Sequence, residues 1–490
     1  MVRASDERKN RLETPNESES TRTVSTSTGG PELASFVLLP EPRENAPRAE
    51  PAGRAKKHPL QLVPPNGVVT QRNRYTMKRK KVKVHSLTGR ITPRLMRQAF
   101  QKVKRNRGAA GVDKVSLRMF EANLEENLAA LMRDLKTRQF RPRPLRRVYI
   151  PKGPNSNKRR PLGIPVVRDR VAQEVVRRLL APIFEPMFHD DSYGFIPGRN
   201  CHQAIERVLD LHRQGHCVVL DADIEGFFGN LPHRVIVQAV AAEVADGNVL
   251  RLVEGFLSAG VMEDGVFKPT TVGTPQGAVI SPLLANIVLN CLDWRLHETG
   301  YRFVRYADDF VVVCQTQRQA QEALDLVRHV LGSDLGLKLS PEKTQITTYG
   351  KGYEFLGFIL SSRCRRMCAK SVQRFKAKVR ELTARKHNLD SMVIEKLNRV
   401  IRGTANYFAT RFSTGRWLFQ KLDSWLRMRL RAMKFKRKSY GDNRKLRVRT
   451  FSRTLGLLTL EGYCTTRDAA SGQVRRVIPR HGATPAGVAR

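Results

Sequence analysis

Acidic residues are scarce in this sequence. Only 45 Asp and Glu stand against 88 Lys and Arg among 490 residues, which gives a formal net charge of +43 at pH 7. A surface this basic repels itself unless it meets a polyanion, so nucleic acid is the expected partner. A membrane is disfavoured as a partner, because the sequence has no uninterrupted apolar stretch of the roughly 20 residues that cross a bilayer.

The sequence also lacks the marks of an exported protein. Residues 1–12 are charged and contain no apolar signal-peptide core, which predicts a cytoplasmic protein associated with the nucleoid or with a ribonucleoprotein. The seven cysteines are scattered and odd in number, as is common in a reducing cytosol. Cys364 and Cys368 are the only close pair. Because no second Cys or His pair accompanies them, no structural zinc is expected.

The composition of the chain changes near Met77. Residues 1–76 are rich in Ser, Thr, Glu, Pro and Gly without sustained periodicity, which predicts a disordered tail. Met77 is therefore a candidate for the biological start. The basic run over residues 72–83 is either a solvated tail or a phosphate-binding arm, and the overall charge favours the arm. Mixed strand and helix patterns, followed after residue 371 by basic helical patterns, predict an α+β core and then an all-helical domain.

Two apolar runs meet at Tyr306-Ala307-Asp308-Asp309. Two such runs joined by a tight turn predict a β-hairpin with adjacent carboxylates at its tip. Asp is also common in turns for local hydrogen-bonding reasons, so this pair alone does not establish a functional site.

A second apolar run, residues 218–224, also ends in carboxylates, those of Asp221 and Asp223. Phosphoryl transfer with two Mg²⁺ ions needs acidic ligands that converge from separate strands, with the ions roughly 3.5–4 Å apart. Carboxylate oxygens are hard ligands that suit Mg²⁺. Strand alternation places Asp221 and Asp223 on the same face, so periodicity does not choose between them.

Several blocks of the sequence, in a characteristic order, resemble a known family. They are RPLGIP, SYGFIPGRNCHQAI, DADIEGFFGNLPH, GTPQGAVISPLLANIVLNCLD, YADDF, GLKLSPEKT and EFLGF. These blocks resemble the motifs of group II intron reverse transcriptases. The block RNRGAAGVDKVS resembles the extra amino-terminal finger motif that retroviral enzymes lack, and IRGTANYF resembles the maturase, or thumb, domain. The resemblance runs from about Val84 to Lys438.

The resemblance implies an α+β right-hand polymerase fold with fingers and palm, followed by an all-helical thumb/maturase domain. The implied ranges are fingers with an amino-terminal extension at 77–215, palm at 216–365, helical thumb/maturase domain at 366–440 and a basic, DNA-binding-like tail at 441–490. Within the first of these ranges, residues 160–215 contribute to the fingers.

The resemblance also implies an activity and its partners. The family members are RNA-directed DNA polymerases that use Mg²⁺ and deoxynucleotides (dNTPs) to extend a DNA primer on an RNA template. They bind group II intron RNA, assist its splicing and support intron mobility into target DNA. Whether this protein forms a homodimer stays open.

Two other functions compete with this interpretation. A splicing-only maturase typically loses the catalytic carboxylates, whereas Asp223, Asp308 and Asp309 are all present. A domesticated reverse transcriptase used in defence or repair is disfavoured by the maturase-like block and by the absence of a fused extra domain. The sequence contains no HNH-like cluster of paired cysteines, so it resembles the shorter, endonuclease-free bacterial lineage.

The matching motifs imply roles for individual residues. Asp223 and Asp308 correspond to metal ligands, and Asp309 corresponds to the third carboxylate. Ile224 would offer its backbone carbonyl to the metal. Asp221 is expected to be a supporting residue.

The same motifs imply a nucleotide-binding side. Phe228 stands where the family places a steric gate, a ring that would clash with a ribose 2′-hydroxyl, although a core aromatic beside Phe227 is the alternative. Gln276 is expected to pack against the incoming nucleotide and its base pair.

Three basic residues are implied around the triphosphate. Lys152 and Arg160 are candidate clamps on its phosphates, since fixed cations there stabilise charge that develops in the transfer. They would otherwise contact template phosphates. Lys343 corresponds to a lysine near the pyrophosphate, with a solvated lysine as the alternative.

Residues 417–438 combine aromatic, aliphatic and basic residues at helical spacing. Trp417 and Trp425, with neighbouring leucines, are expected to form one apolar face. The cations of the other faces have few acidic partners, which favours phosphate binding over a merely solvated face. Arg427, Arg431 and Lys434 are the candidate nucleic-acid-binding residues.

The composition of residues 1–76 leads to a first prediction. A chain that starts at Met77 should extend a DNA primer on RNA at a rate similar to that of the full chain, because the removed segment cannot bury a core. Primer extension by equal concentrations of the two purified proteins measures this. A large loss of specific activity in the shorter chain would contradict the prediction.

Overall fold

The computed structural model describes residues 83–151, 159–464, 466–467 and 474–475. All of them belong to one unit, Lys78–Arg490, of the two into which contacts divide the chain. The predicted tail, residues 1–76, and the candidate phosphate clamp Lys152 lie outside the described residues. None of the helices in the described ranges is long and apolar enough to cross a membrane.

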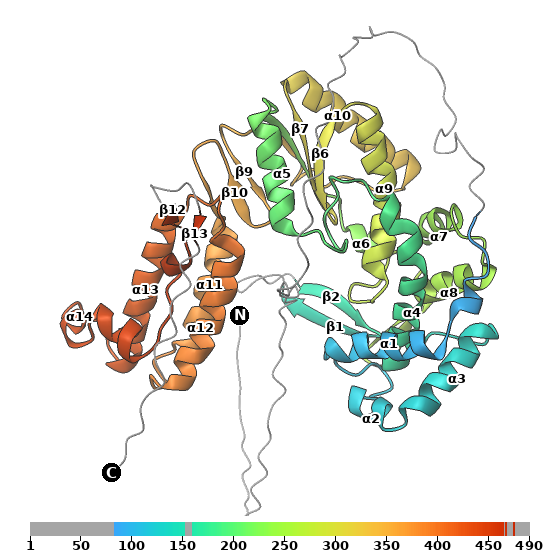
Figure 1. Ribbon diagram of the computed structural model, residues 1–490, viewed down its shortest axis with the longest axis horizontal. Coiled ribbons are helices and arrows are strands. Elements are labelled where there is room, and N and C mark those ends of the chain that lie inside the picture. Colours follow the sequence, from blue (N-terminus) through green and yellow to red (C-terminus); the bar gives the residue numbers. More distant parts are fainter. Residues whose placement is uncertain (1–82, 152–158, 465, 468–473, 476–490) are drawn as a thin grey trace, which may run out of the picture. The chain divides into compact units, whose positions relative to one another are not determined.

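The centre of the unit is an antiparallel four-stranded sheet in the order β6-β7-β3-β8, of which Figure 1 labels β6 and β7. Its strands are β3 (Val218–Ala222), β6 (Arg302–Tyr306), β7 (Asp309–Cys314) and β8 (Gln345–Thr348). β3 pairs with β7 from Val218↔Cys314 to Ala222↔Phe310. This register brings the end of β3 beside the beginning of β7, where both predicted groups of carboxylates lie.

Each face of this sheet is covered by its own apolar core. On one face, Leu220 and Val312 join a large core with the helices α9 (Ser281–Glu298) and α10 (Gln317–His329). On the other face, Val219 and Val311 join a second core with α5 (Cys201–Arg213), the helix that lies beside the sheet in Figure 1. Alternate residues of the same strand enter different cores, because successive side chains of a strand point to opposite faces.

The fingers region combines helices with a second sheet in the order β2-β1-β4-β5. The helices of this region and those that border it are α1 (Pro93–Arg105), α2 (Leu117–Ala122), α3 (Leu124–Lys136), α4 (Val167–Phe184), α6 (Phe227–Asn230), α7 (His233–Ala241) and α8 (Gly247–Ser258). The strands are β1 (Leu145–Pro151), β2 (Arg159–Ile164), β4 (Val261–Glu263) and β5 (Val266–Lys268). β1 runs antiparallel to β2 and parallel to β4. Residues 261–268 therefore join the fingers sheet, although they fall within the range predicted for the palm.

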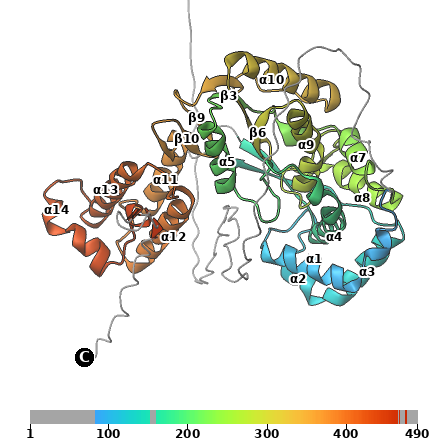
Figure 2. The same cartoon turned by 45° about the horizontal axis from the view of Figure 1, so that its top comes forward.

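A small sheet, β9 (Tyr353–Phe355), β10 (Phe358–Leu360) and β11 (Arg365–Met367), precedes the helical domain. Three helices, α11 (Ala369–Leu382), α12 (Ser391–Phe408) and α13 (Arg416–Lys434), surround a separate apolar core (Figures 1 and 2). The short helix α14 (Asp442–Lys445) and the residues up to Tyr463 pack against the same core. The predicted fold class, α+β with a helical carboxyl-terminal domain, is confirmed; the domain borders stay a prediction.

Candidate active site

The predicted hairpin with carboxylates at its tip is present. β6 ends at Tyr306 and β7 begins at Asp309, and these two residues are register partners. Ala307 and Asp308 form the two-residue turn between them, and Ala307 has a φ of 58°. Positive φ is what tight hairpin turns require of their central residues, and a residue with a Cβ adopts it only when its surroundings hold it there.

A buried arginine holds this turn. Arg305, in β6, is 0% exposed, and its Nε donates a hydrogen bond to Oδ1 of Asp293 at 2.7 Å. Its Nη2 donates to the other carboxylate oxygen of Asp293, which is also 0% exposed. Nη1 donates to the side-chain oxygen of Asn286 and to the carbonyl of Ala307, both at 2.9 Å. One guanidinium therefore ties the turn to α9.

The segment around Gly194 closes on the same turn. Asn286 donates from Nδ2 to the carbonyl of Gly194 at 2.8 Å, and the amide of Tyr193 donates to the carbonyl of Arg305 at 2.9 Å. A Cβ at Gly194 would lie 2.3 Å from the amide nitrogen of Ala307. Only glycine fits at this position without displacing the turn.

The carboxylates influence one another electrostatically. Burial raises the pKa of Asp308 above its usual value, and the charge of Asp223 acts in the same direction. Loss of hydration, followed by the charges of Asp308, Asp223 and Asp221, raises the pKa of Asp309 to about 6. Carboxylates that repel one another in this way would be stabilised by a cation among them.

Asp223 is held from the segment that precedes β8. Its carbonyl accepts a hydrogen bond from the amide of Ser340 at 2.8 Å, and its Oδ2 lies 2.7 Å from Nζ of Lys343. The lysine is exposed, so this ion pair contributes little to stability. The structure thus places Lys343 at the carboxylates, where its ammonium supplies the nearest positive charge to Asp223.

Asp221 differs from Asp223 in its partners. Its Oδ2 accepts a hydrogen bond from Nε2 of Gln345 at 3.3 Å. Burial, and to a smaller extent the charge of Asp223, raises the pKa of Asp221 to about 6. Ile224 is buried and forms an isolated β-bridge with Leu339. This pairing fixes the backbone that carries the carbonyl of Ile224.

Of the predicted nucleotide-binding residues, Phe228 lies in the short helix α6 and Gln276 lies on a loop bonded to that helix. Phe228 is half-buried, and its ring centroid is 5.1 Å from that of the buried Phe227. The amide of Thr274 donates to the carbonyl of Phe228 at 2.6 Å, so the loop that carries Gln276 is joined to α6. Within the described residues, Oε1 of Gln276 is buried without a hydrogen-bond partner. A ligand with a donor group would satisfy this oxygen.

The fingers sheet reaches the same place through Arg160. This residue is exposed on β2 and pairs with Ile150 of β1. The charge of Arg160 lowers the pKa of Asp308, against the larger effect of burial, so the two groups are within electrostatic reach. The structure therefore brings one of the two predicted clamps to the carboxylates.

The predicted nucleic-acid-binding residues of α13 differ in their surroundings. Lys434 is exposed and Arg427 is half-buried. Arg431 is only 8% exposed, donates from Nε to the carbonyl of Leu446 at 2.9 Å and lies over the ring of Phe451. We therefore correct the expectation for Arg431, because a guanidinium engaged inside the domain is not presented to a phosphate.

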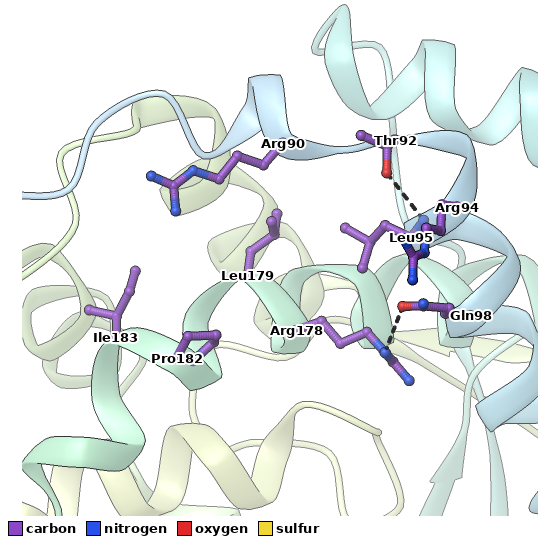
Figure 3. Close-up of a pocket in the computed structure, with 9 residues that line it drawn as sticks. All are labelled: Arg90, Thr92, Arg94, Leu95, Gln98, Arg178, Leu179, Pro182 and Ile183. Carbon is purple, nitrogen blue, oxygen red and sulfur yellow. Dashed lines mark hydrogen bonds between the residues drawn. The ribbon is translucent and has the colours of Figure 1, made fainter.

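A pocket of about 420 Å³ lies elsewhere, between α1 and α4 (Figure 3). Arg90, Arg94 and Arg178 line it together with Leu179 and Ile183. It contains none of the predicted site residues. Arg178 donates a hydrogen bond there to the side-chain oxygen of Gln98, as the dashed line in Figure 3 shows, and another to the carboxylate of Glu174.

No three His, Cys, Asp or Glu side chains in the described part of the chain are arranged so that they could hold a metal ion. Asp223, Asp308 and Asp309 are thus neighbours rather than a preformed cage. Sequence reasoning missed the residues that hold their turn, Arg305, Asn286 and Asp293. The available signal was a charged residue inside an otherwise apolar strand, next to a helix with a single carboxylate in its apolar face.

Comparison with known proteins identifies the class of the two domains. Residues 150–360 match the family described as reverse transcriptase (RNA-dependent DNA polymerase). Residues 372–450 match the group II intron, maturase-specific domain. The chain therefore carries a reverse transcriptase domain followed by a maturase domain.

Curated relatives agree with this class. The chain is 36% identical to protein YkfC of Escherichia coli over an alignment of 285 residues, and the match covers 50% of this chain and 74% of YkfC. It is 30% identical to the group II intron-encoded protein LtrA of Lactococcus lactis over 334 residues, and the match covers 55% of each protein. A solved telomerase from Candida albicans matches with a TM-score of 0.38 at 14% identity over 63% of each chain. The chain belongs to the group II intron-encoded reverse transcriptase/maturase family.

The support of the carboxylate turn can be tested with Asn286→Ala. This change removes the bonds to Arg305 and Gly194, and each buried hydrogen bond removed costs about 1–3 kcal/mol. The turn should then shift, and nucleotide incorporation should fall by at least about tenfold, which corresponds to 1.4 kcal/mol on the barrier.

The matched control is Asn290→Ala, one turn further along α9. Asn290 also bonds to the backbone, at His189 and Met187, but it does not touch the turn. Both variants should lower the midpoint of thermal unfolding, whereas only Asn286→Ala should slow primer extension. Equal activities of the two variants would show that the turn does not depend on Asn286.

Proposed function

We propose that this protein is an RNA-directed DNA polymerase that also binds its group II intron RNA, assists its splicing and supports intron mobility. The main support is the meeting of Asp223 with Asp308 and Asp309 at neighbouring strand ends, inside the segment that matches reverse transcriptases. The maturase-specific match of residues 372–450 supports the role in splicing. The splicing-only alternative is not favoured, because the carboxylates are kept.

The donors are of the chemical type that Mg²⁺ prefers. Asp223, Asp308 and Asp309 supply hard oxygen ligands, and the backbone carbonyl of Ile224 is a further oxygen donor. Burial is the main cause of the raised pKa values of Asp308 and Asp309, and the charges of neighbouring carboxylates add to it. When bound, Mg²⁺ would lower the pKa of the primer 3′-hydroxyl and neutralise charge on the triphosphate.

The protein's own residues would position the substrates. Arg160 and Lys152 would bind the triphosphate, since fixed cations stabilise the negative charge that develops during transfer. Lys343, which pairs with Asp223 in this structure, would turn to the departing pyrophosphate. The unsatisfied Oε1 of Gln276 would accept a hydrogen bond from the incoming nucleotide or its base pair.

Phe228 would select deoxynucleotides. Its half-buried ring lies beside that of Phe227, and its backbone carbonyl accepts a hydrogen bond from the amide of Thr274, which anchors the residue under a sugar placed above it. A 2′-hydroxyl would then clash with the ring. The natural substrates of the proposed reaction are therefore dNTPs, a DNA primer and an RNA template.

The other partners belong to the intron cycle. The basic helical domain would hold the intron RNA through its phosphates and shape, in a cytoplasmic ribonucleoprotein. Arg427 and Lys434 remain candidates for these contacts. Reverse transcription primed at target DNA would complete the mobility of the intron.

The central prediction concerns Asp308→Asn. This change removes a negative charge but keeps nearly the same side-chain size. DNA synthesis should fall by roughly a thousandfold, because several kcal/mol of charge stabilisation act directly on the barrier. Assisted splicing of the intron RNA at low Mg²⁺ should persist near the parental level, since the RNA itself supplies that chemistry.

The control for this variant is Asp325→Asn, an equal charge change at an exposed position on α10. It should leave both activities unchanged. An Asp308→Asn protein that still makes cDNA would contradict the proposed site. A parent protein that makes none, yet assists splicing, would favour the splicing-only maturase.

A further prediction concerns substrate selection. Phe228→Ala or Phe228→Val should raise the incorporation of ribonucleotides relative to deoxynucleotides, because the clash with the 2′-hydroxyl is removed. Phe228→Tyr keeps the ring and should keep the parental ratio. Single-nucleotide incorporation with matched ribo- and deoxynucleotides measures this ratio. An unchanged ratio in the Ala variant would mean that the ring only packs against the core.

A further inference from the structure

The helical domain carries a row of cations and tryptophans between α11 and α13, which we call the ridge. Its residues are Arg366, Lys376, Arg380, Trp417, Lys421, Trp425 and Arg429. The four that belong to α13 follow one another at intervals of four residues. They therefore lie along one face of the helix, over about 18 Å at 1.5 Å per residue.

Only one of the two tryptophans of the ridge packs against the helical core, as the sequence pattern predicts. Trp417 is 44% exposed, and Trp425 lies only partly buried at the edge of the helical core. Nζ of Lys421 is 4.8 Å from the ring centroid of Trp417, and the guanidinium carbon of Arg366 is 5.2 Å from it. The ring thus holds two cations beside each other at the surface.

Trp425 has the same arrangement. Nζ of Lys376 is 5.5 Å and the guanidinium carbon of Arg380 is 5.7 Å from its ring centroid. Arg429, one turn further along α13, donates from Nη2 to the carbonyl of Thr383 at 2.9 Å. These interactions restrict the long basic side chains, which reduces the entropy that they would lose on binding a ligand.

The ridge lacks negative charge. Among the residues that the structure describes, none of its cations forms an ion pair with Asp or Glu, whereas Lys378 and Arg399 of the same domain each do. Nε of Arg366 is buried without a hydrogen-bond partner. Burial, followed by the charges of Arg380 and Arg385, lowers the pKa of Arg429. An anion bound among these like charges would reduce their mutual repulsion.

We propose that the ridge binds the phosphate backbone of the structured intron RNA, an inference that rests on the function proposed above. The row of cations is long enough to contact several phosphates, which a single small anion would not need. The exposed part of Trp417 offers a surface for an unpaired base, and structured RNA has such bases in its loops and bulges, unlike a regular primer–template duplex. Residues 372–450, which include all of the ridge except Arg366, match the maturase-specific domain.

The ridge is separate from the cations that the sequence pattern indicates. Arg427 lies within electrostatic reach of Asp423 and Glu461, and Arg431 packs on Phe451. These residues face the segment that follows α13. The ridge faces α11 instead, so the two sets of side chains can be changed independently.

The test is a double variant, Arg380→Gln with Lys421→Gln. Binding is measured to the RNA transcribed from the DNA that surrounds the reading frame and, separately, to an RNA–DNA hybrid primer–template. For the transcript, the slope of log affinity against log salt should become shallower by about two, because each removed cation leaves one phosphate without its partner. The hybrid should bind to the double variant as tightly as to the parent.

Two controls accompany the double variant. Lys378→Gln with Arg399→Gln removes the same charge from the same domain, but at residues that have acidic partners. Arg380→Lys with Lys421→Arg keeps the charge of the ridge. Both should bind the transcript with the parental salt slope, and all variants should share the parental midpoint of thermal unfolding.

The outcomes distinguish the ridge from the polymerase. A parental salt slope of the double variant overturns the proposal. A loss of affinity confined to the hybrid, together with slower primer extension, overturns it too, because the ridge would then bind the primer–template. A parent that binds the transcript but makes no cDNA contradicts the polymerase and leaves the ridge testable. A parent that does not bind the transcript overturns the ridge and the splicing role together.

Discussion

The buried ion pair of Arg305 and Asp293 is the constraint on which the candidate active site depends. Removing two charges from water is costly, and deleting either partner would leave an uncompensated buried charge at about 3–5 kcal/mol. The same guanidinium also bonds to Asn286 and to the carbonyl of Ala307. The position of Asp308 is thereby set by a helix that precedes the hairpin in the sequence. Asn286 and Asp293 belong to the block GTPQGAVISPLLANIVLNCLD, and Gly194 belongs to the block SYGFIPGRNCHQAI. Residues of these two blocks meet at the turn of the hairpin.

A strongly basic chain here surrounds a local excess of negative charge. The net charge of +43 attracts nucleic acid as a whole, whereas the carboxylates at the strand ends repel one another and have raised pKa values. Arg160 and Lys343 supply positive charge nearby, but they do not neutralise the carboxylates completely. An acidic centre inside a basic protein is what a Mg²⁺-dependent polymerase of nucleic acids needs, because the polymer and the metal have opposite charges.

The helical domain divides its cations between two uses. Arg431 packs against Leu446 and Phe451 inside the domain. Others, such as Lys421 and Arg380, lie on tryptophan rings at the surface. Counting basic residues on a helix therefore overstates the number that can reach a phosphate. The side chains without acidic partners in the described residues are the ones that an RNA would neutralise.

Local pattern by itself determined the fold class, the hairpin at Tyr306–Asp309 and the strand that ends in Asp221 and Asp223, because strand alternation and turn chemistry act over a few residues. It did not reveal the pairing of residues 261–268 with the fingers sheet or the exposure of Trp417, since a helical repeat shows which residues share a face but not which face meets the core. Only the tertiary structure decided that Arg305 holds the turn and that Arg431 is enclosed. Both depend on packing between segments that are separated in sequence, and residue type alone does not record such packing.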